Sequence, residues 1–364
     1  MSIYYPRITK GGVPCYWLLC IILIIVAGFR FKLGIDTYSY TNEYKYFPKL
    51  SQLKISFIKE SNYRILWILF EATCRTITSS FYFLQIVLAI FVNFAVFKFV
   101  KQYSLYPFLT ILFYYLLFYL NLNMEILRES IPICIFLFGI SFIIKKNYFK
   151  YYILAIIAYF FHESGIILFI IPFLTRIKWD KRLFIFVITL LVIFSGLLSI
   201  YFVNYIKNLD FLFNSNKFGY FEFQSASSGN QFLSNIIKYV VTPSVVLLLF
   251  FKKLTTFEKS IIFLYILFSI LSTQSFIFYR IRDYFLIPFL ISVTNGFTLG
   301  VNKKFNNLIS KGAFLFCFLF IFLYKYYSGN NKGYNIYLNF YPYNSILNED
   351  LPQSRVLNFQ KVYD

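Results

Sequence analysis

Long, continuous runs of apolar residues constrain the fold of this chain more than any other feature of its sequence. The runs cover residues 13–29, 81–100, 105–121, 129–144, 183–203, 236–251, 260–277, 284–301 and 312–327. A helix needs about 20 apolar residues to cross a bilayer, and a water-soluble core cannot absorb a chain of 364 residues that is 59% hydrophobic and 14% charged. The sequence therefore predicts an all-α, polytopic integral membrane protein, and it excludes a soluble enzyme, a disordered chain and a secreted disulfide scaffold.

Two further segments are apolar but interrupted. Residues 64–78 carry charged side chains at near-helical spacing, which favours a helix lying at the membrane interface over one that spans it. The run 151–174 is broken by the sequence His162-Glu163-Ser164-Gly165, where a glycine weakens the helix and allows the chain to turn back. We therefore expect a re-entrant hairpin near His162 and about 9–11 membrane segments in a single domain, residues 1–364.

The distribution of basic residues predicts the orientation of the chain. It carries 35 Lys and Arg against 15 Asp and Glu, a formal net charge of +20. Basic residues mark cytoplasmic loops, and the predicted spans place these on one side in short loops: Arg7, Lys10, Lys98, Lys101, Lys145, Lys146, Lys150, Arg176, Lys178, Lys181, Arg182, Lys252, Lys253, Lys259, Lys303, Lys304 and Lys311. We expect a cytoplasmic amino terminus, external segments at residues 30–80, 204–235 and 328–364, and no nucleic-acid partner.

Two groups of polar residues lie near predicted spans in the first half of the chain. Arg30, Gly34, Asp36 and Tyr40 follow the first run with the spacing R-x-x-x-G-x-D-x-x-x-Y. This pattern fits a helix that ends at the glycine with Asp36 capping the next one, and it also fits a cation and a carboxylate at a membrane-edge sugar site. At the start of a later span, Arg128 can either pair with a neighbouring acid or bind a phosphate through its planar fork.

Two more groups lie in the second half. His162 and Glu163 interrupt an apolar run, where ionisable residues are costly and usually functional; the alternative is a structural histidine at a helix break. Arg280, Arg282 and Tyr284 lie between two predicted spans, in a short external turn. They fit either an Arg–Asp pair in a loop or a site for an anionic ligand.

These groups resemble the segments of one family in order. RFKLGIDTYSY, LRESIP, AYFFHESG, YRIRDYF and FYPYNSIL each look like a segment of the EpsG family, which comprises Wzy-type polymerases of bacterial O-antigen, capsule and exopolysaccharide. Glu129 departs from the pattern, because the family usually has Gln at the residue after the arginine of the second segment. The resemblance spans most of the chain.

The resemblance implies glycosyl transfer between undecaprenyl-diphosphate-linked oligosaccharide repeat units on the external (periplasmic) face of the bacterial cytoplasmic membrane. The acceptor hydroxyl must lose a proton, and the leaving diphosphate must be neutralised. The expected acid–base residues are His162, Asp36 and Glu163. The residues expected to bind diphosphate or sugar are Arg30, Arg128, Arg280, Arg282, Tyr40 and Tyr284. No metal or cofactor is called for.

The expected partners are the lipid-linked oligosaccharide, the bilayer, and a chain-length regulator and flippase of the same pathway. Two other functions stay open. A lipid-linked oligosaccharide flippase would line a pathway with buried Arg and His, although such transporters usually show two related halves. A membrane acyltransferase would use His162 on a fatty-acyl group.

Overall fold

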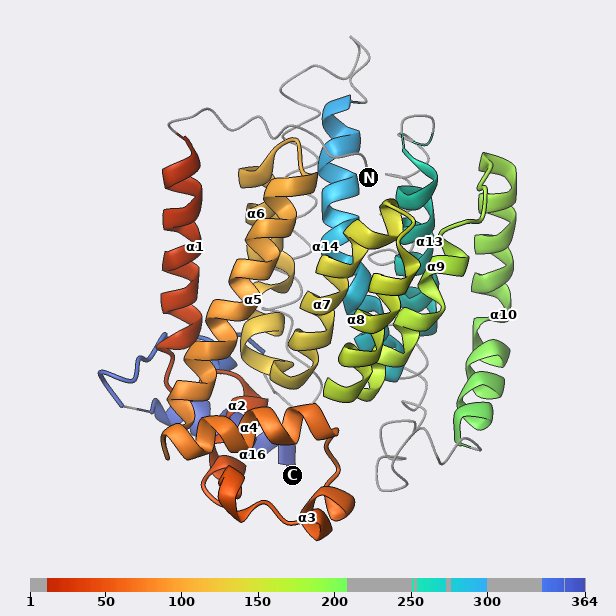
Figure 1. Cartoon of the computed structure of the whole chain (residues 1–364). Helices are drawn as coiled ribbons and strands as arrows, with labels where there is room; N and C mark the ends of the chain where they lie inside the picture. Colours follow the sequence, from red (N-terminus) through yellow and green to blue (C-terminus); the bar gives the residue numbers. More distant parts are fainter. Residues whose placement is uncertain are drawn as a thin grey trace. The chain divides into compact units, whose positions relative to one another are not determined.

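The computed structural model describes residues 12–207, 251, 254–272, 276–299, 336–349 and 351–363 (Figure 1). Within these ranges every regular element is a helix, which confirms the all-α class. Two helices are long and apolar enough to cross a membrane, α5 (Phe81–Tyr103) and α7 (Leu127–Ile144), and several shorter apolar helices accompany them. The helices are those of a membrane protein, as the apolar runs predict.

The chain divides into two compact units that interleave along the sequence. The first, called the α1 unit below, comprises Ile8–Lys98, Ile111–Cys134 and Asn302–Asp364. The second, called the α14 unit, comprises Met1–Arg7, Phe99–Thr110 and Ile135–Val301. Helices α5, α6 and α7 contribute residues to both units.

The α1 unit contains membrane-type helices and a set of shorter ones. Its elements are α1 (Gly12–Gly28), α2 (Ile35–Tyr44), η1 (Leu50–Gln52), α3 (Ile55–Glu60), α4 (Ile65–Ile77), most of α5, the end of α6 (Pro107–Tyr114), the π-helical turns η2 (Tyr115–Tyr119) and η3 (Asn121–Glu125), the start of α7, η8 (Ile336–Asn339) and α16 (Gln353–Tyr363). Helix α1 packs along α5, where the Tyr16 hydroxyl donates to the Phe97 carbonyl at 2.8 Å. Its opposite face exposes Leu18, Ile21 and Ile25, as expected of a lipid-facing helix.

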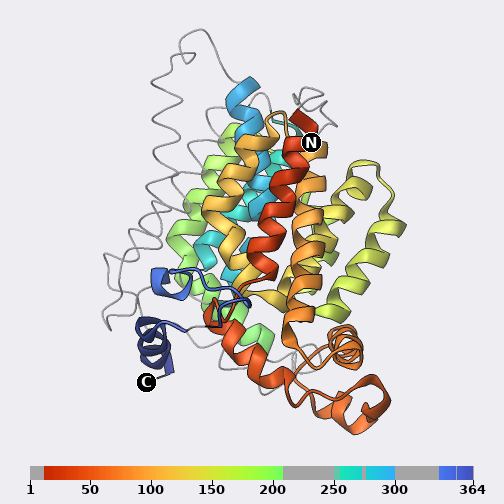
Figure 2. The ribbon, with the colours of Figure 1, turned by 90° about the vertical axis from the view of Figure 1, so that its left-hand side faces the viewer.

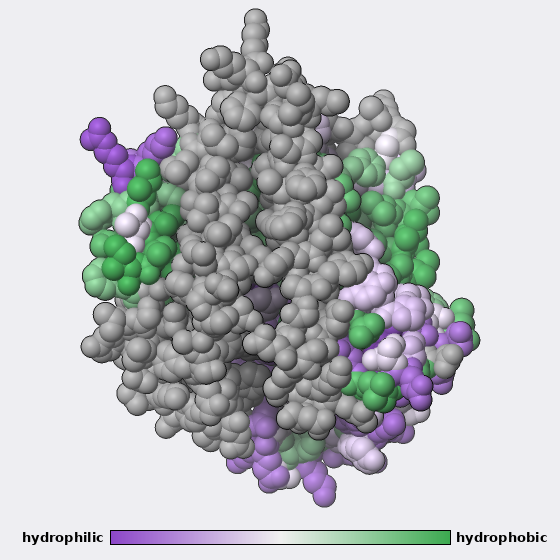
Figure 3. All heavy atoms as spheres, turned by 180° about the vertical axis from the view of Figure 1, so that it is seen from behind, coloured by the Kyte–Doolittle hydropathy of each residue, from purple (hydrophilic) through white to green (hydrophobic). Residues whose placement is uncertain are grey.

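Helix α4 corresponds to the segment predicted to lie at the interface. It buries Trp67, Ile68 and Ala72, and the last two pack with Phe47 from the segment after α2. Figures 1 and 2 show α4 lying crosswise to α1 and α5. On the right of Figure 3, the surface of this unit changes from apolar over α1 to hydrophilic over the residues that follow it. The helix is therefore confirmed, and its place at a membrane surface stays a prediction.

The α14 unit is built around an antiparallel pair of apolar helices. Its elements are the end of α5, the start of α6, most of α7, α8 (Tyr148–Phe161), η4 (Glu163–Phe169), α9 (Ile171–Leu174), α10 (Lys181–Lys207), α13 (Thr256–Leu271) and α14 (Phe276–Leu299). Stacked rings join α13 to α14: the centroids of Tyr265 and Phe289 lie 4.4 Å apart, and those of Phe268 and Phe285 lie 5.8 Å apart. These rings form the core of the pair.

The prediction of a turn at residues 278–283 is wrong. Helix α14 begins at Phe276 and continues without a break through both arginines of this segment. The segment tolerates a helix because the Arg282 guanidinium pairs with the neighbouring Asp283 carboxylate and lies over the Tyr279 ring. The expected external loop at 204–235 lies mostly outside the described residues, and α10 continues through its first part to Lys207.

Candidate functional site

Arg30 is a fully buried cation directly after α1 in the α1 unit. Its guanidinium donates to the Ala27 carbonyl and, at 3.4 Å, to the Thr37 hydroxyl. The Gln85 amide donates to the Arg30 carbonyl at 2.9 Å and so fixes the backbone at this point. Burial lowers the pKa of Arg30 to about 10, so the side chain remains charged at neutral pH. Arg30 is thus held inside the unit by a backbone carbonyl of α1 and a side-chain hydroxyl of α2.

Gly34 permits a close approach between two distant segments. It has φ +88°, and a Cβ at this position would lie 2.7 Å from the Met124 carbonyl oxygen. The approach lets the Glu125 carboxylate accept from the backbone N–H groups of Ile35 and Asp36, each at 3.3 Å. Helix α2 is therefore capped by Glu125 from another segment, while Asp36 lies in its first turn.

The carboxyls of Asp36 and Glu125 lie near each other at this cap. Burial, and then the charge of Asp36, raise the pKa of Glu125 to about 7, against the two backbone donors. Neighbouring carboxyls whose pKa values are pushed apart are one arrangement that supports acid–base chemistry. The sequence provides no direct sign of this role for Glu125, because the residues it caps lie about ninety positions earlier.

The segment near the carboxyl end pairs with the residues around Arg30. The backbone N–H of Phe31 donates to the Asn344 carbonyl at 2.8 Å, and that of Gly34 donates to the Asn339 carbonyl at 3.0 Å. Arg355, which the sequence analysis did not single out, is fully buried and donates to Asn344 Oδ1 at 3.1 Å. The tyrosine-rich segment therefore closes over the first motif of the chain.

Arg128 lies between aromatic rings at the start of α7. Its guanidinium carbon is 4.3 Å from the centre of the Tyr63 ring and 5.5 Å from that of Tyr40, and its Nε donates to the Tyr40 hydroxyl at 3.1 Å. Nearby, burial and then the charge of Glu43 raise the pKa of Glu71 to about 8, while Arg128 acts in the opposite sense. Two of the predicted site residues, Arg128 and Tyr40, thus lie together.

In the α14 unit, His162 marks the turn of a helical hairpin. Helix α8 ends at Phe161 and the 3₁₀ helix η4 begins at Glu163. A Cβ on Gly165 would lie 2.8 Å from backbone atoms of Ala158, so the returning segment packs directly against α8. The predicted turn at His162 is confirmed, whereas its depth in a membrane stays a prediction.

The His162 side chain is held by a chain of hydroxyl groups. Its Nδ1 lies 2.7 Å from the Ser164 hydroxyl, and the Ser164 backbone N–H donates to the same nitrogen at 3.2 Å. The Ser164 hydroxyl lies 2.7 Å from the hydroxyl of Tyr284 on α14. All three side chains are buried. Sequence reasoning proposed His162 and Tyr284 for separate roles, and the structure brings them together through Ser164.

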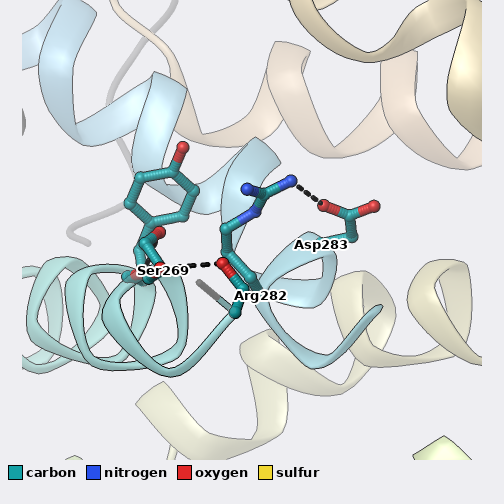
Figure 4. A network of polar contacts seen from close by, with 5 residues as sticks. Ser269, Arg282 and Asp283 are labelled. Carbon is teal, nitrogen blue, oxygen red and sulfur yellow. Dashed lines mark hydrogen bonds and ion pairs between the residues drawn. The ribbon is translucent and has the colours of Figure 1, made fainter. Parts of the chain in front are cut away.

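The remaining predicted residues of this unit are a partly buried acid and two arginines. Glu163 occupies the first position of η4 and is half-buried. Arg282 is buried, with its guanidinium 3.1 Å from Asp283 Oδ1 (Figure 4). Arg280 is half-buried one turn before Tyr284 on the same helix. Of these two arginines, Arg280 is the more exposed to solvent.

The predicted site residues form two groups. Arg30, Asp36, Tyr40 and Arg128 belong to the α1 unit. The α14 unit contains the other group: His162, Glu163, Arg280, Arg282 and Tyr284. In the part of the chain that the structure describes, no three His, Cys, Asp or Glu side chains are grouped closely enough to hold a metal ion. The α1 unit group offers guanidinium, carboxyl and phenol groups, and the α14 unit group offers these together with the imidazole of His162.

One of three comparisons with known proteins, that with family models, agrees with the motifs of the sequence. Neither the curated proteins nor the solved structures contain a match to the chain. The model of the EpsG family matches residues 14–345, from the start of α1 to the segment that closes over Arg30. The chain therefore belongs to the EpsG family, which is linked to exopolysaccharide biosynthesis.

Proposed function

We propose that the protein is a membrane glycan polymerase that joins polyprenyl-diphosphate-linked oligosaccharide repeat units by glycosyl transfer. Family membership and the apolar helices support a membrane step in polysaccharide biosynthesis. The observation that favours polymerisation is His162, a buried imidazole at the break of an apolar hairpin with its Nδ1 bound to a hydroxyl. Glycosyl transfer to a hydroxyl needs such a base. A flippase would use a buried histidine only to line its pathway, and its sequence would usually show two related halves.

The reaction sets two tasks for the protein. The bond between the donor sugar and its diphosphate breaks, a new bond forms to the acceptor hydroxyl, and the hydroxyl proton passes to a base. His162 is our candidate base, because an imidazole takes up and releases protons near neutral pH. Asp36 and Glu163 are the alternatives, and the structure adds Glu125 beside Asp36 as a further carboxyl.

The leaving diphosphate requires cations with accessible donors. Arg128 in the α1 unit and Arg280 in the α14 unit are half-buried, and each is the candidate for this task within its own unit. Arg282 already pairs with Asp283, and the fully buried Arg30 donates to the Ala27 carbonyl and the Thr37 hydroxyl, so both are better suited to support than to direct contact. Tyr40 holds Arg128 through its hydroxyl and belongs to the same binding group.

We place this chemistry at the external face of the bacterial cytoplasmic membrane. The clustering of basic residues in short loops supports a cytoplasmic amino terminus. A flippase of the same pathway would then deliver the lipid-linked repeat unit to this face, and a chain-length regulator would set the number of additions.

Deletion of the gene followed by gel electrophoresis of the surface glycan tests the proposal. We expect glycan with a single repeat unit in the deletion strain, and a ladder of longer chains after complementation with the wild-type gene. Complete loss of surface glycan with intracellular accumulation would indicate a flippase instead. Unchanged chain length with a product lighter by one acyl group would indicate an acyltransferase.

A further inference from the structure

Three side chains from two elements form one hydrogen-bonded chain in the α14 unit. It runs from Nδ1 of His162 to the hydroxyl of Ser164 and on to the hydroxyl of Tyr284, with both links at 2.7 Å. The exposed fractions of these residues are 6%, 8% and 0%, so water does not compete freely for the links. Short bonds between buried polar groups hold their members in fixed orientations.

The hairpin also has hydrogen bonds that do not involve these three side chains. The backbone N–H of His162 donates to the Ala158 carbonyl, and the N–H of Gly165 donates to the His162 carbonyl. The Tyr151 hydroxyl also ties α8 to the returning segment at the Leu168 carbonyl. The link from Ser164 to α14 adds nothing that this turn requires. The link has a free-energy cost, because two hydroxyl groups are buried away from water.

A hydroxyl partner leaves both protonation states of the imidazole possible. A carbonyl or carboxylate can only accept, so it requires a proton on Nδ1. The hydroxyl of Ser164 can either donate to Nδ1 or accept from it, and that of Tyr284 can do the same for Ser164. The Ser164 backbone N–H, at 3.2 Å, favours an Nδ1 without a proton, whereas the shorter contact with the Ser164 hydroxyl can hold the ring with or without a proton on Nδ1.

The packing of Tyr284 makes it a rigid end for the chain. Its ring is fully buried on α14, with its centroid 6.4 Å from that of Phe136 on α7. A phenylalanine at this position would keep the ring and remove only the hydroxyl. This offers a variant that separates the hydrogen bond from the packing.

We propose that Ser164 and Tyr284 are positioning residues that hold the His162 imidazole through Nδ1 and direct proton exchange with the acceptor sugar hydroxyl to Nε2. The proposal rests on the proposed polymerase function. Nε2 acts as the base in the neutral ring that carries its proton on Nδ1, where Nδ1 donates to the Ser164 hydroxyl and Ser164 donates to Tyr284. When Nε2 takes the hydroxyl proton, the ring becomes an imidazolium and keeps this Nδ1 bond. The proton leaves from Nε2 to water or to the departing diphosphate, which restores the neutral ring.

The single histidine of the chain allows a direct test. Protein labelled with ¹⁵N-histidine, and purified with an affinity tag that lacks histidine, shows ring nitrogen signals from His162 alone. Their shifts report which nitrogen carries the proton, and their titration reports the balance of protonation states. We expect Ser164→Ala to move the Nδ1 signal and the titration midpoint, Tyr284→Phe to move them less, and Ser164→Thr to return them toward the wild-type values.

Polymerisation by the same preparations in proteoliposomes, followed as a function of pH, connects these signals to the reaction. We expect a rate loss of about 10-fold or more for Ser164→Ala at unchanged abundance, since general acid–base catalysis contributes at least this much. Tyr284→Phe should show a smaller loss, and Ser164→Thr should retain activity. The pH profile should shift in step with the titration of His162.

The possible failures are distinct. Wild-type signals and a wild-type pH profile in both Ser164→Ala and Tyr284→Phe would overturn the positioning role while the polymerase function stands. Loss of rate in Ser164→Ala with unchanged His162 signals would overturn it as well, because the effect would then not pass through the imidazole. Wild-type protein that forms no glycosidic bond would remove the proposed function, and this inference with it.

Discussion

The surroundings of Arg30 and of His162 use buried polar side chains in different ways. The Arg30 guanidinium donates to the Ala27 carbonyl and to the Thr37 hydroxyl, and the backbone beside it pairs with the segment near Asn344. His162 bonds instead to the hydroxyl of Ser164, which in turn bonds to Tyr284. His162 also accepts from the Ser164 backbone N–H, so each side chain bonds to backbone and to a hydroxyl. The difference lies in their chemistry, because a guanidinium stays charged, whereas an imidazole can take up and release a proton.

Both regions nevertheless depend on a glycine at a close contact. Gly34 meets the Met124 carbonyl, and Gly165 meets the backbone of Ala158. In the first region the contact brings Glu125 to the start of α2, and in the second it turns the hairpin at His162. The glycines are thus structural in both places, and the difference lies in the side chains that they position.

The largest effect that we expect is a loss of folded protein in Gly34→Ala. The backbone at Gly34 has φ +88° and ψ 141°, which costs other residues about 1–3 kcal/mol, and the added Cβ would lie 2.7 Å from a carbonyl oxygen. Abundance in the membrane and the thermal midpoint in detergent measure the effect. Gly28→Ala is the matched control, because its Cβ would meet the Ile86 side chain at 3.3 Å without a strained φ. Equal stability of the two variants would contradict the close approach between α2 and the Glu125 segment.

A smaller effect, on activity alone, is expected for Arg128→Lys. Lysine keeps the charge but loses the planar fork and the stack on Tyr63. One charge-assisted contact contributes about 1.5–3 kcal/mol, so polymerisation should fall by about 10- to 100-fold with near-normal abundance. Glycan length in the complemented deletion strain is the measurement. Tyr40→Phe is a milder control that removes only the hydroxyl accepting from Arg128. Normal chain length in Arg128→Lys would show that the reaction does not require the planar fork of this arginine.

The smallest effect concerns the pH dependence of stability through Glu71. Its pKa is raised to about 8 in the folded protein by burial and by Glu43, above the value of about 4.3 in an unfolded chain. The raised pKa favours folding at low pH, and this contribution is lost as the pH rises through about 8. Glu71→Gln keeps a neutral side chain, so we expect its thermal midpoint to fall less between about pH 6 and pH 9, by about 2–4 °C for each kcal/mol.

The exposed Glu60 provides the comparison for this measurement, because Glu60→Gln removes an acid of the same type from the surface of α3. Its thermal midpoint should follow that of the wild type at each pH. Identical pH dependence of Glu71→Gln and the wild type would show that Glu71 is ionised throughout this range in the folded protein.

Local patterns predicted much of the fold. The apolar runs predicted α1, α5, α7 and α8, since each is a continuous stretch of apolar residues. The polar break with a following glycine predicted the turn at His162, because both features act on the backbone within a few residues. The same reasoning placed a turn at residues 278–283, where the pairing of Arg282 with Asp283 instead lets a helix continue.

Contacts between distant segments were not predictable in this way. Glu125 caps a helix about ninety positions earlier, and Asn344 pairs with Phe31 about three hundred positions earlier; neither leaves a periodic signal in the sequence. Ser164 belongs to a recognised motif, but its bond to Tyr284 depends on how α14 packs beside the hairpin. The sequence thus identified candidate residues, while the contacts on which their proposed roles rest are visible only in the structure.

The most direct test of this division compares Arg30→Gln with His162→Gln in one deletion strain, with membrane abundance and surface glycan length measured in the same samples. We predict low abundance for Arg30→Gln, because a buried cation that bonds to the backbone is lost. For His162→Gln we predict normal abundance and glycan of a single repeat unit. Normal abundance and a full ladder of glycan chains in His162→Gln would contradict the account, since the imidazole would then be dispensable for both fold and reaction.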